Sequence, residues 1–397
     1  MIELVELKEI CNISSGGTPS RKNSSFYKGE VKWAKISDLE KAGDGFIYDT
    51  EEKITTLGLK NIRNRVFESE TLFLAMYGSV GKTAITKNKM SCNQAILGIT
   101  AKDDEKLNLK YLRYWLDSNK EKLLNSAKGV ALKNLSARMV KDLKIPLPLI
   151  ETQKRIAEIL DNAAALRDKT KQLLDEYDQL AKSIFLEMFG DPVTKQKAFK
   201  RVALDSIVKI SSGSTPSRKT ESYWNGDIPW VKTGEVNSKL ILDTEEKISE
   251  EGLRNSSCKI YTKGSIIIAM YGQGKTRGQV GMLGVNSATN QACAVLQPSD
   301  KINFSYLYEY LKLSYNDLRS LGRGGNQPNL NAGLIKNYQI FLPPIDLQNQ
   351  FAGKIALIEQ QKDLAKQELQ ESENLFHALL KSAFKGELVK EEKFETA

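Results

Sequence analysis

Histidine is nearly absent from this chain of 397 residues, which holds only His377. Because the imidazole ring is the usual general base and metal ligand near neutral pH, chemistry that depends on histidine has almost no material here. Cysteine is also scarce, and the four thiols form no Cys-x-x-Cys pair: they are Cys11, Cys92, Cys258 and Cys293. We predict reduced cysteines that serve packing, no metal site and no cofactor.

Long apolar runs are missing as well. No stretch reaches the roughly 18 apolar residues that a membrane-spanning helix needs. The opening MIELVELKEI has no signal-peptide pattern. We therefore expect a cytoplasmic protein with no membrane association. Hydrophobic residues make up 41% and charged residues 27% of the chain, a composition that suits a soluble protein with more than one core.

Complete catalytic motifs are lacking too. The strings GSVGKT at 78–83 and GQGKT at 272–276 resemble a phosphate-binding loop, but the first glycine of that motif is replaced by Met76 and by Ala269. Glu-Glu-Lys at 51–53 and 245–247 resembles part of a nuclease site. No partner carboxylate precedes it in both places at a matching distance, so we predict a solvated charged turn. The chain has no Asn-Pro-Pro-aromatic methyltransferase motif and no glycine-rich cofactor turn.

What the sequence does contain is an internal duplication. The segment ISSGGTPSRKNSSFYKGEVKWAKISDL at 13–39 returns 197 positions later as ISSGSTPSRKTESYWNGDIPWVKTGEV at 210–236. Further matches follow in the same order: TEEKIT with TEEKIS (50–55, 244–249), LAMYG with IAMYG, each followed by Gly-Lys-Thr (74–78, 268–272), NQA twice (93–95, 290–292), NLKYLRYWL with NFSYLYEYL (108–116, 303–311), and LKIPLPLIETQ with YQIFLPPIDLQ (143–153, 338–348). So many ordered matches indicate one domain-plus-helix unit that occurs twice.

Two long helices are predicted, one after each domain. In 151–189 the apolar positions advance in alternating steps of three and four, which is typical of a coiled coil. These positions are Ile156, Ile159, Ala163, Leu166, Leu173, Tyr177, Leu180 and Ile184, with Thr170 in the remaining slot. The second series is Phe351, Ile355, Ile358, Ala365, Leu369, Phe376, Leu379 and Ala383, interrupted by Lys362 and Ser372. If the two series pair, the chain order makes the helices antiparallel.

The fold class that follows is α+β. Short strand-like runs such as 71–77 and 265–271 are separated by turn residues, and helices are expected near 108–126 and 303–319. We predict two similar domains, 1–149 and 191–345, separated by two long antiparallel coiled-coil helices, 150–190 and 346–388, with a charged tail at 389–397. The arrangement would be an internal pseudo-two-fold repeat.

Several of these segments together resemble the specificity subunits of type I restriction–modification systems. They are the GGTPSR…YW.G.IPW opening, the AMYG…GKT and NQA segments, the LPP…Q lead into a long helix, and the phrases FGDP (189–192) and FKGEL (384–388). The resemblance covers essentially the whole chain. The first opening departs from the pattern, with Phe26-Tyr27 and Val31-Lys32 where the second has Tyr223-Trp224 and Ile228-Pro229. The two domains are therefore expected to differ in detail.

The resemblance implies a non-catalytic subunit that reads a bipartite site in double-stranded DNA. Each of the two domains would be a target-recognition domain for one half of an asymmetric site, and the helices would be conserved spacers. Two DNA methyltransferase (modification) subunits would dock on the chain, and motor-nuclease (restriction) subunits would join them in the full enzyme. The formal net charge of +9 independently favours a polyanionic partner.

Candidate DNA-binding residues lie in the predicted loops. In the first copy they are Thr18, Ser20, Arg21, Lys22, Tyr77, Lys82, Asn93, Gln94 and Lys133. In the second they are Thr215, Ser217, Arg218, Lys219, Tyr271, Lys275, Arg277, Asn290, Gln291, Arg323, Asn326 and Gln327. Amides can read adenine and arginine can read guanine or bind phosphate, but amides also cap turns and arginine also covers surfaces.

Two further expectations concern the surroundings of these residues. The loops 128–134 and 323–329 differ between the copies, so they are better placed to carry different sequence preferences. The aromatic residues Trp33, Trp230, Tyr27 and Trp224 are predicted to lie in the domain cores and not to stack on bases.

Two alternatives to a DNA-recognition subunit remain open at this point. One is a self-sufficient nuclease or nucleotide hydrolase that acts on DNA through the basic Gly-Lys-Thr loops. The other is a structural adaptor whose helices join proteins and whose positive charge is incidental.

Overall fold

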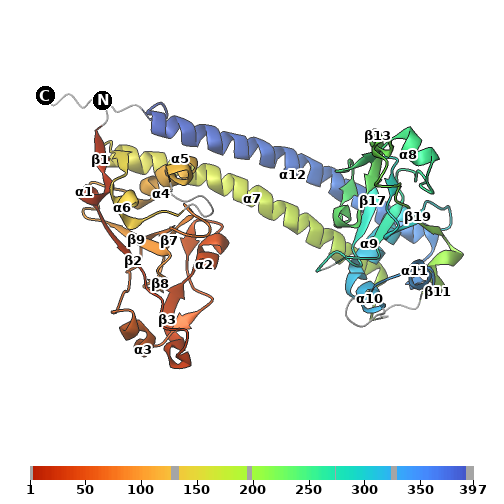
Figure 1. The fold of residues 1–397 in the computed structure, drawn as a ribbon, viewed down its shortest axis with the longest axis horizontal. Helices are drawn as coiled ribbons and strands as arrows, with labels where there is room; N and C mark the ends of the chain where they lie inside the picture. The colour runs from red at the N-terminus through yellow and green to blue at the C-terminus, as the bar shows by residue number, and fades with distance from the viewer. Residues whose placement is uncertain (1–2, 127–133, 195–198, 273, 323–328, 390–397) are drawn as a thin grey trace. The chain divides into compact units, whose positions relative to one another are not determined.

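The computed structural model describes residues 3–126, 134–194, 199–272, 274–322 and 329–389 (Figure 1). Its internal contacts divide the chain into two units: Met1–Leu173 with Ala365–Ala397, and Leu174–Leu364. Both units share two long helices, α7 (Ile150–Phe189) and α12 (Ile345–Lys385). Each unit therefore consists of one α+β domain and one end of each long helix.

The first domain contains three small sheets. A five-stranded sheet has the order β2-β9-β6-β7-β4, a three-stranded sheet has the order β5-β3-β8, and β1 pairs with β10. The strands are β1 (Leu4–Glu6), β2 (Cys11–Ser15), β3 (Tyr27–Ala34), β4 (Phe46–Ile47), β5 (Lys53–Ile54), β6 (Leu72–Ala75), β7 (Thr83–Thr86), β8 (Ser91–Cys92), β9 (Ile96–Ala101) and β10 (Lys144–Pro146). The helices are α1 (Leu7–Ile10), α2 (Ile36–Lys41), α3 (Thr56–Asn61), α4 (Leu109–Ser118), α5 (Lys120–Ser126), α6 (Ala137–Lys141) and the 3-10 turn η1 (Ser24–Phe26).

The central strand β6 explains how this domain is layered. All four of its residues are buried, as expected of a strand covered on both faces. Leu72 and Leu74 point into a core shared with α4 and α7, whereas Phe73 and Ala75 point into a second core shared with α2 and β8. The sheet is thus sandwiched between the helices and the smaller sheet, and β3 and α3 lie at the end of the domain away from α7 (Figure 1).

The second domain repeats this topology strand for strand. Its sheets have the orders β12-β19-β16-β17-β14, β15-β13-β18 and β11-β20. The strands are β11 (Arg201–Ala203), β12 (Lys209–Ser212), β13 (Trp224–Val231), β14 (Leu240–Ile241), β15 (Lys247–Ile248), β16 (Ile266–Ala269), β17 (Val280–Leu283), β18 (Ala288–Thr289), β19 (Cys293–Gln297) and β20 (Gln339–Phe341). The helices are α8 (Glu250–Arg254), α9 (Phe304–Leu313), α10 (Tyr315–Ser320), α11 (Ala332–Lys336) and the 3-10 turns η2 (Leu204–Ser206), η3 (Glu221–Tyr223) and η4 (Thr233–Glu235).

The duplication read from the sequence is therefore a duplication of fold. The copies differ where α2, a helix of six residues, is reduced to the single turn η4. The helices expected near 108–126 and 303–319 are each broken in two, at Asn119 and at Ser314.

The ends of the long helices pack against each other inside each unit. In the first unit, the guanidinium of Arg167 on α7 lies 5.0 Å from the ring centroid of Phe376 on α12, and Lys171 pairs with Glu373 at 3.2 Å. In the second, Lys362 on α12 pairs with Asp178 on α7 at 2.8 Å. The start of α7 thus meets the end of α12 and the reverse holds in the other unit, so the helices are antiparallel as predicted.

The predicted apolar series on α7 was wrong at two of its positions. Leu166 and Leu180 are 45% and 46% exposed, whereas Leu160 and Ala181, which the series leaves out, are buried. The reason is that α7 packs on the two domains as well as on α12: Leu160 belongs to the core of the first domain and Ala181 to that of the second. These contacts with the domains extend the buried surface of the helix beyond the predicted series.

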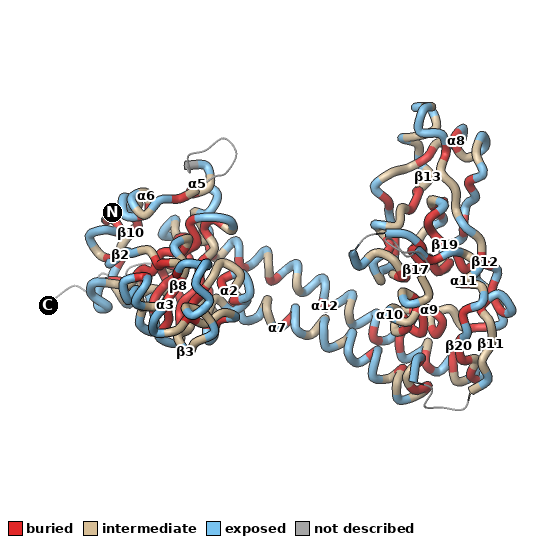
Figure 2. The backbone as a smooth tube through the Cα atoms, turned by 60° about the horizontal axis from the view of Figure 1, so that its bottom comes forward, coloured by how far each residue is buried: buried red, intermediate tan, exposed pale blue. Residues whose placement is uncertain are grey.

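Within each unit the buried residues concentrate in the sheets and in the helices packed on them (Figure 2). No helix in the described ranges has the length and apolar character needed to cross a membrane. The same described ranges contain no group of three or more histidine, cysteine or acidic side chains that could hold a metal ion.

Candidate nucleic-acid interface

Three segments that recur in both copies meet in the first domain. They are the opening loop 16–22, the turn 76–82 between β6 and β7, and the Asn-Gln-Ala turn 93–95 before β9; we call them the turn cluster. The backbone N–H of Gly17 donates to the carbonyl of Cys92 (2.8 Å), and that of Met76 donates to the carbonyl of Ala95 (2.8 Å). Segments far apart in the sequence are thereby held side by side.

The second domain has an equivalent turn cluster formed by 213–219, 270–279 and 290–292. The N–H of Ser214 donates to the carbonyl of Thr289 (2.9 Å), and that of Met270 donates to the carbonyl of Ala292 (2.8 Å). The hydroxyl of Thr215 also donates to the side-chain carbonyl of Gln291, which ties the opening loop to the Asn-Gln-Ala turn.

The residues that come directly after the two variable loops contact the turn clusters. The N–H of Leu135 donates to the carbonyl of Met76, and the N–H of Leu330 to that of Met270, each at 3.0 Å. The chain that follows each variable loop is therefore anchored on the turn cluster. The candidates Lys133, Arg323, Asn326 and Gln327 themselves lie outside the described residues.

A glycine makes this close packing possible in each copy. A Cβ atom on Gly16 would lie 2.1 Å from the carbonyl oxygen of Cys92, and one on Gly213 would lie 2.1 Å from that of Thr289. Such a distance is far below van der Waals contact and the obstacle is backbone, which cannot rotate away. Only glycine allows the opening loop to lie directly on the Asn-Gln-Ala turn.

We expect Gly16→Ala to destabilise the first domain by about 1–3 kcal/mol, as overpacking does elsewhere. Gly43→Ala is the matched control, since a Cβ there meets nothing within 4 Å. Denaturant unfolding of the two variants checks this. Equal stability of both would show that the opening loop does not need its close approach to the Asn-Gln-Ala turn.

The asparagines of the Asn-Gln-Ala turns shape the turns. The side-chain oxygen of Asn93 accepts from the N–H of Ala95, and that of Asn290 accepts from the N–H of Ala292, both at 3.1 Å. This is the capping alternative noted from the sequence. The neighbouring Gln94 is exposed, so its amide is the freer candidate for contact with a base.

The two Gly-Lys-Thr strings are not structurally equivalent. The N–H of Ala75 donates to the carbonyl of Lys82, and the matching bond in the second domain runs from Ala269 to Gln279, both at 2.9 Å. Lys82 therefore corresponds to Gln279 and not to Lys275. The second turn is three residues longer, with nine residues between its bonded pair where the first has six.

The geometry of these turns also differs from that of a phosphate-binding loop. Such a loop leads from a strand into the N-terminus of a helix, where backbone N–H groups surround the phosphates. Here the glycine turns join antiparallel strands, β6 to β7 and β16 to β17. The hydroxyl of Thr83, which would hold a magnesium ion, donates instead to the carboxylate of Asp117 at 2.8 Å. Burial raises the pKa of Asp117, and the Thr83 hydrogen bond opposes that rise.

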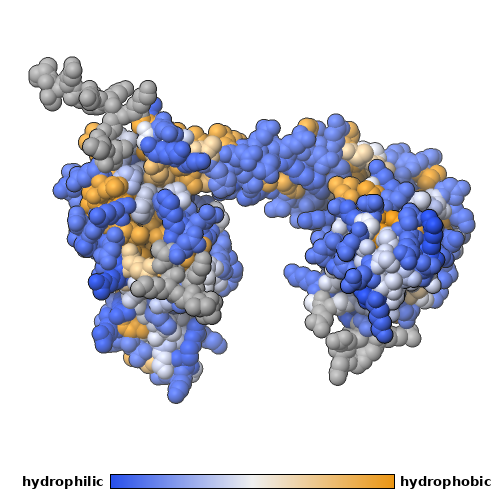
Figure 3. Space-filling view, turned by 45° about the horizontal axis from the view of Figure 1, so that its top comes forward, coloured by the Kyte–Doolittle hydropathy of each residue, from blue (hydrophilic) through white to orange (hydrophobic). Residues whose placement is uncertain are grey.

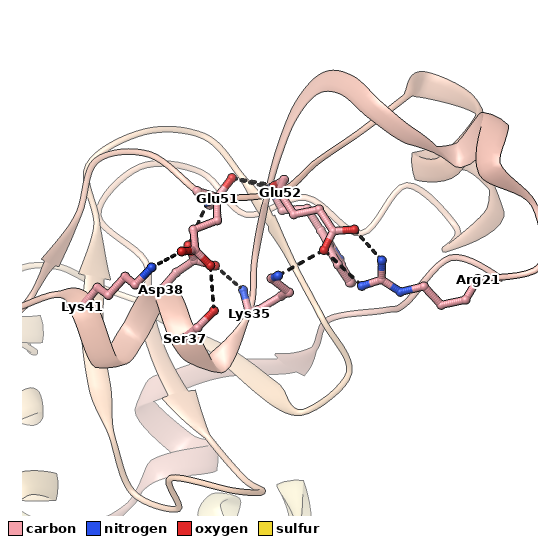
Figure 4. A network of polar contacts seen from close by, with 9 residues as sticks. Arg21, Lys35, Ser37, Asp38, Lys41, Glu51 and Glu52 are labelled. Carbon is pink, nitrogen blue, oxygen red and sulfur yellow. Dashed lines mark hydrogen bonds and ion pairs between the residues drawn. The ribbon is translucent and has the colours of Figure 1, made fainter. Parts of the chain in front are cut away.

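Arg21 in the opening loop is engaged by its own domain. Its guanidinium forms two bonds to the carboxylate of Glu52, at 2.5 and 3.1 Å, and lies 4.4 Å from the ring centroid of Tyr27. Lys35 binds the same carboxylate at 3.1 Å (Figure 4). The hydrogen bond from Arg21 holds the pKa of the Glu52 carboxyl below its usual range.

Arg218 is also ion-paired and stacked on a ring in the second domain, through one nitrogen–oxygen contact to its glutamate where Arg21 has two. Its guanidinium lies 2.6 Å from Glu246 and 3.7 Å from the ring centroid of Trp224, and Lys232 binds Glu246 at 3.0 Å. We call each set, Arg21–Glu52–Tyr27 and Arg218–Glu246–Trp224, an arginine clamp.

The Glu-Glu-Lys turn is a charged surface turn in both domains, with Glu51 and Glu245 exposed, but its glutamates are ion-paired. In the first domain the Glu51 carboxylate accepts hydrogen bonds from Lys41 and Ser37 (Figure 4). The Glu52 carboxylate is paired with Arg21 and Lys35. Sequence reasoning missed Glu52 and Glu246 as partners of the candidate arginines. The signal was available: the Ser-Arg-Lys and Glu-Glu-Lys strings recur together in both copies.

Trp33 and Trp230 are core residues, as predicted, with exposed fractions of 1% and 2%. Their indole N–H groups donate to the opening loop, to the carbonyls of Gly17 and Ser214, each at 2.9 Å. Tyr27 and Trp224 are only partly buried, since one face of each ring carries the clamp arginine.

The remaining candidates divide by exposure. Exposed side chains belong to Ser20, Arg21, Lys22, Tyr77, Gln94, Ser217, Arg218, Lys219, Tyr271, Lys275 and Gln291. Partly buried ones belong to Thr18, Lys82, Asn93, Thr215, Arg277 and Asn290. In the second domain an open cavity of about 700 Å³ lies against the turn cluster, lined by Thr215, Arg218, Trp230, Lys232, Thr233, Gly234, Glu235, Glu245 and Asn290.

The family model for the type I restriction modification DNA specificity domain matches residues 2–177 and again 196–374. Since these two matches cover most of the chain, the protein belongs to this family of DNA specificity subunits. Its function is DNA target recognition within a type I restriction–modification system.

Individual relatives agree with this assignment. The MjaIX specificity subunit of Methanocaldococcus jannaschii is 24% identical over 98% of this chain and 94% of its own. The EcoR124I/EcoR124II specificity subunit of Escherichia coli is 26% identical over 64% of each chain. Among solved structures, the type I S subunit of Mycoplasma genitalium matches over 96% of both chains with a TM-score of 0.55 at 18% identity. A chain from a structural study of type I complex assembly matches over 97% of this chain and 98% of its own, with a TM-score of 0.60 at 19% identity.

Nothing in this geometry or in these relatives supports the nuclease or nucleotide-hydrolase alternative. The two copies of the fold and of the turn cluster correspond to the two matches of one recognition domain.

Proposed function

We propose that this chain is the non-catalytic reader of the complex, with residues 1–149 and 191–345 each recognising one half of an asymmetric bipartite site. The observation that carries the proposal is that the two domains share one backbone fold but differ in side chains and in one helix near the turn cluster. The same backbone bonds hold both turn clusters, yet Lys82 in one corresponds to Gln279 in the other, and α2 is reduced to η4. Two domains with the same backbone fold and different side chains are suited to recognise two different half-sites.

Contact with the DNA backbone is supported by charge. The formal net charge is +9, and exposed lysines such as Lys22, Lys219 and Lys275 lie in the turn clusters. Such residues supply affinity that falls with salt, because binding releases counterions from the phosphates. Base selection is then left to exposed amides and to the loops that differ between the copies.

We infer that the helices 150–190 and 346–388 act as spacers and as the docking surface for two DNA methyltransferase subunits. Supporting this, large apolar side chains of the helices are exposed: Leu166 and Leu375 in the first unit, and Leu180, Leu357 and Leu364 in the second. Figure 3 shows areas of hydrophobic surface on the long helices among mostly hydrophilic surface. Large apolar side chains that are exposed together in one patch mark protein interfaces. One set in each unit suits one methyltransferase subunit per unit.

The proposal has two further parts. Motor-nuclease subunits would join the complete enzyme, and family membership supports this. Action in the cytoplasm is supported by the cysteines, since Cys11, Cys92, Cys258 and Cys293 are all free thiols.

The purified chain alone is expected to show no methyl transfer, DNA cleavage or ATP hydrolysis. Adding cognate methyltransferase subunits is expected to produce methylation at one bipartite sequence, because the chain supplies recognition and the added subunits supply chemistry. Incorporation of labelled methyl groups into plasmid DNA measures this. Turnover by the chain alone that disappears in Lys82→Ala/Lys275→Ala would refute the proposal in favour of an enzyme built on the glycine turns.

A further inference from the structure

We propose that the arginine clamps hold the opening loops in the shape that reads DNA, so that Arg21 and Arg218 are positioning residues and do not themselves bind guanine or phosphate. The proposal rests on the DNA-reading role of the turn clusters. On this proposal the two glutamates that hold the arginines, Glu52 and Glu246, are also necessary for DNA recognition, although they are negatively charged like DNA.

The guanidinium of Arg21 is already paired within its own domain. Both terminal nitrogens of Arg21 are bound to the two carboxylate oxygens of Glu52. A bidentate arginine–carboxylate pair is the same geometry that would be needed to read guanine or to grip a phosphate. Contact with DNA would therefore require the pair to break.

The guanidinium groups of Arg21 and Arg218 each lie against two aromatic rings as well. In the first domain the distances from Arg21 are 4.4 Å to Tyr27 and 5.2 Å to Trp33. In the second they are 3.7 Å from Arg218 to Trp224 and 5.1 Å to Trp230. Stacking on ring faces adds to the ion pair and limits the directions in which the side chain can move.

The arginine clamp of the first domain is connected through Trp33 to the rest of the turn cluster. Trp33 lies under Arg21 and its indole N–H holds the carbonyl of Gly17 in the same loop (2.9 Å). The N–H of Gly17 in turn is bound to Cys92, immediately before the Asn-Gln-Ala turn (2.8 Å). An unbroken series of contacts thus runs from Glu52 through the opening loop to the residues best placed to meet bases.

The arrangement occurs twice in one chain, although its parts have diverged. The ring that carries the arginine is tyrosine in the first domain and tryptophan in the second, and yet the carboxylate, the second cation from Lys35 or Lys232, and the ring beneath are all retained. In the second domain burial acts to raise the pKa of Glu246, but the neighbouring cations Arg218 and Lys232 keep it below its usual range. Both clamps therefore hold an ionised carboxylate.

A contact role and a positioning role predict opposite results for one substitution. If Arg21 bound DNA, Glu52→Gln would free it and remove a repulsive charge, and binding would tighten. If Arg21 positions the loop, Glu52→Gln loosens the loop and binding to the cognate site weakens. Glu30→Gln is the matched control, because Glu30 is an exposed glutamate on β3 of the same domain.

The test uses the chain assembled with its methyltransferase subunits and measures affinity for cognate and unrelated DNA over a range of salt. We expect Glu52→Gln and Arg21→Lys each to lower cognate affinity at least tenfold, because lysine reproduces neither the bidentate pair nor the stacking. Affinity for unrelated DNA and the slope of log K against log salt should not change. Tighter binding by Glu52→Gln, or a slope reduced by about one in Arg21→Gln, would overturn the proposal.

A second measurement separates this proposal from the one it rests on. Hydrogen exchange of residues 16–22 in the DNA-free chain should be faster in Glu52→Gln than in Glu30→Gln, and unchanged exchange would refute the clamp. Glu246→Gln should weaken discrimination at the other half-site only. If it altered both half-sites while exchange at 213–219 still increased, the clamp would stand and the assignment of one domain to one half-site would fall.

Discussion

Exchange of residues 191–345 for the matching domain of another family member is expected to replace one half of the recognised sequence and to leave the other half unchanged. The physical reason is that each domain has its own cores and its own turn cluster. A wrong base pair costs about 1–3 kcal/mol, so the old half-site should lose about 5- to 150-fold in affinity per altered pair. Sequencing of methylated positions in DNA modified by the reconstituted enzyme measures the outcome.

The control for this exchange alters the helices and spares the domains. Four residues inserted after Leu173 in α7 and four after Leu364 in α12, where the two units meet in sequence, would lengthen each helix by about 6 Å. The number of unread bases between the half-sites should change while both half-sites stay the same. A domain exchange that changed both halves, or an insertion that changed bases and kept the spacing, would contradict the division of labour.

Phe185→Ala is expected to destabilise the second unit by about 3–5 kcal/mol, the usual loss for a fully buried phenylalanine. The Phe185 ring is completely buried, with its centroid 5.6 Å from that of Tyr306 and 5.5 Å from that of Phe351. It therefore joins α7 both to the domain and to α12. Denaturant unfolding gives the size of the loss, and hydrogen exchange shows whether it is confined to 174–364.

Leu180→Ala is the matched control on the same helix. The apolar spacing of the sequence predicts Leu180 at a buried position, but its side chain is 46% exposed. We expect its removal to change stability by no more than about 0.5 kcal/mol. Equal losses for the two variants would mean that Leu180 is buried, as the apolar spacing of the sequence predicts.

The clamp arginines show how far residue type alone can be trusted at a binding surface. Arginine in a basic loop suits contact with guanine or with phosphate, which makes Arg21 and Arg218 candidates by residue type. The structure, however, places a glutamate from a different segment on each guanidinium. The partner lies 31 positions away in the first domain and could be inferred only by asking which strings recur together in both copies.

The same limit applies to the glycine turns. The identical Gly-Lys-Thr sequences suggest that Lys82 and Lys275 occupy equivalent positions, but the strand register makes Lys82 the counterpart of Gln279. Backbone hydrogen bonds define which residues correspond in the two domains. Because the second turn has three additional residues, the same short sequence falls at a different structural position in it.

By itself the sequence determined the duplication, the α+β class, the two long helices and the family, because each of these depends on patterns that repeat over many residues. The tertiary structure alone decided that Leu166 and Leu180 of α7 are exposed, how the three turns meet, and which carboxylates hold Arg21 and Arg218. Those features depend on contacts between segments far apart in the chain. A helix can leave an apolar residue of its series exposed, and an arginine can bind an internal carboxylate, without any change in the local pattern from which the sequence is read.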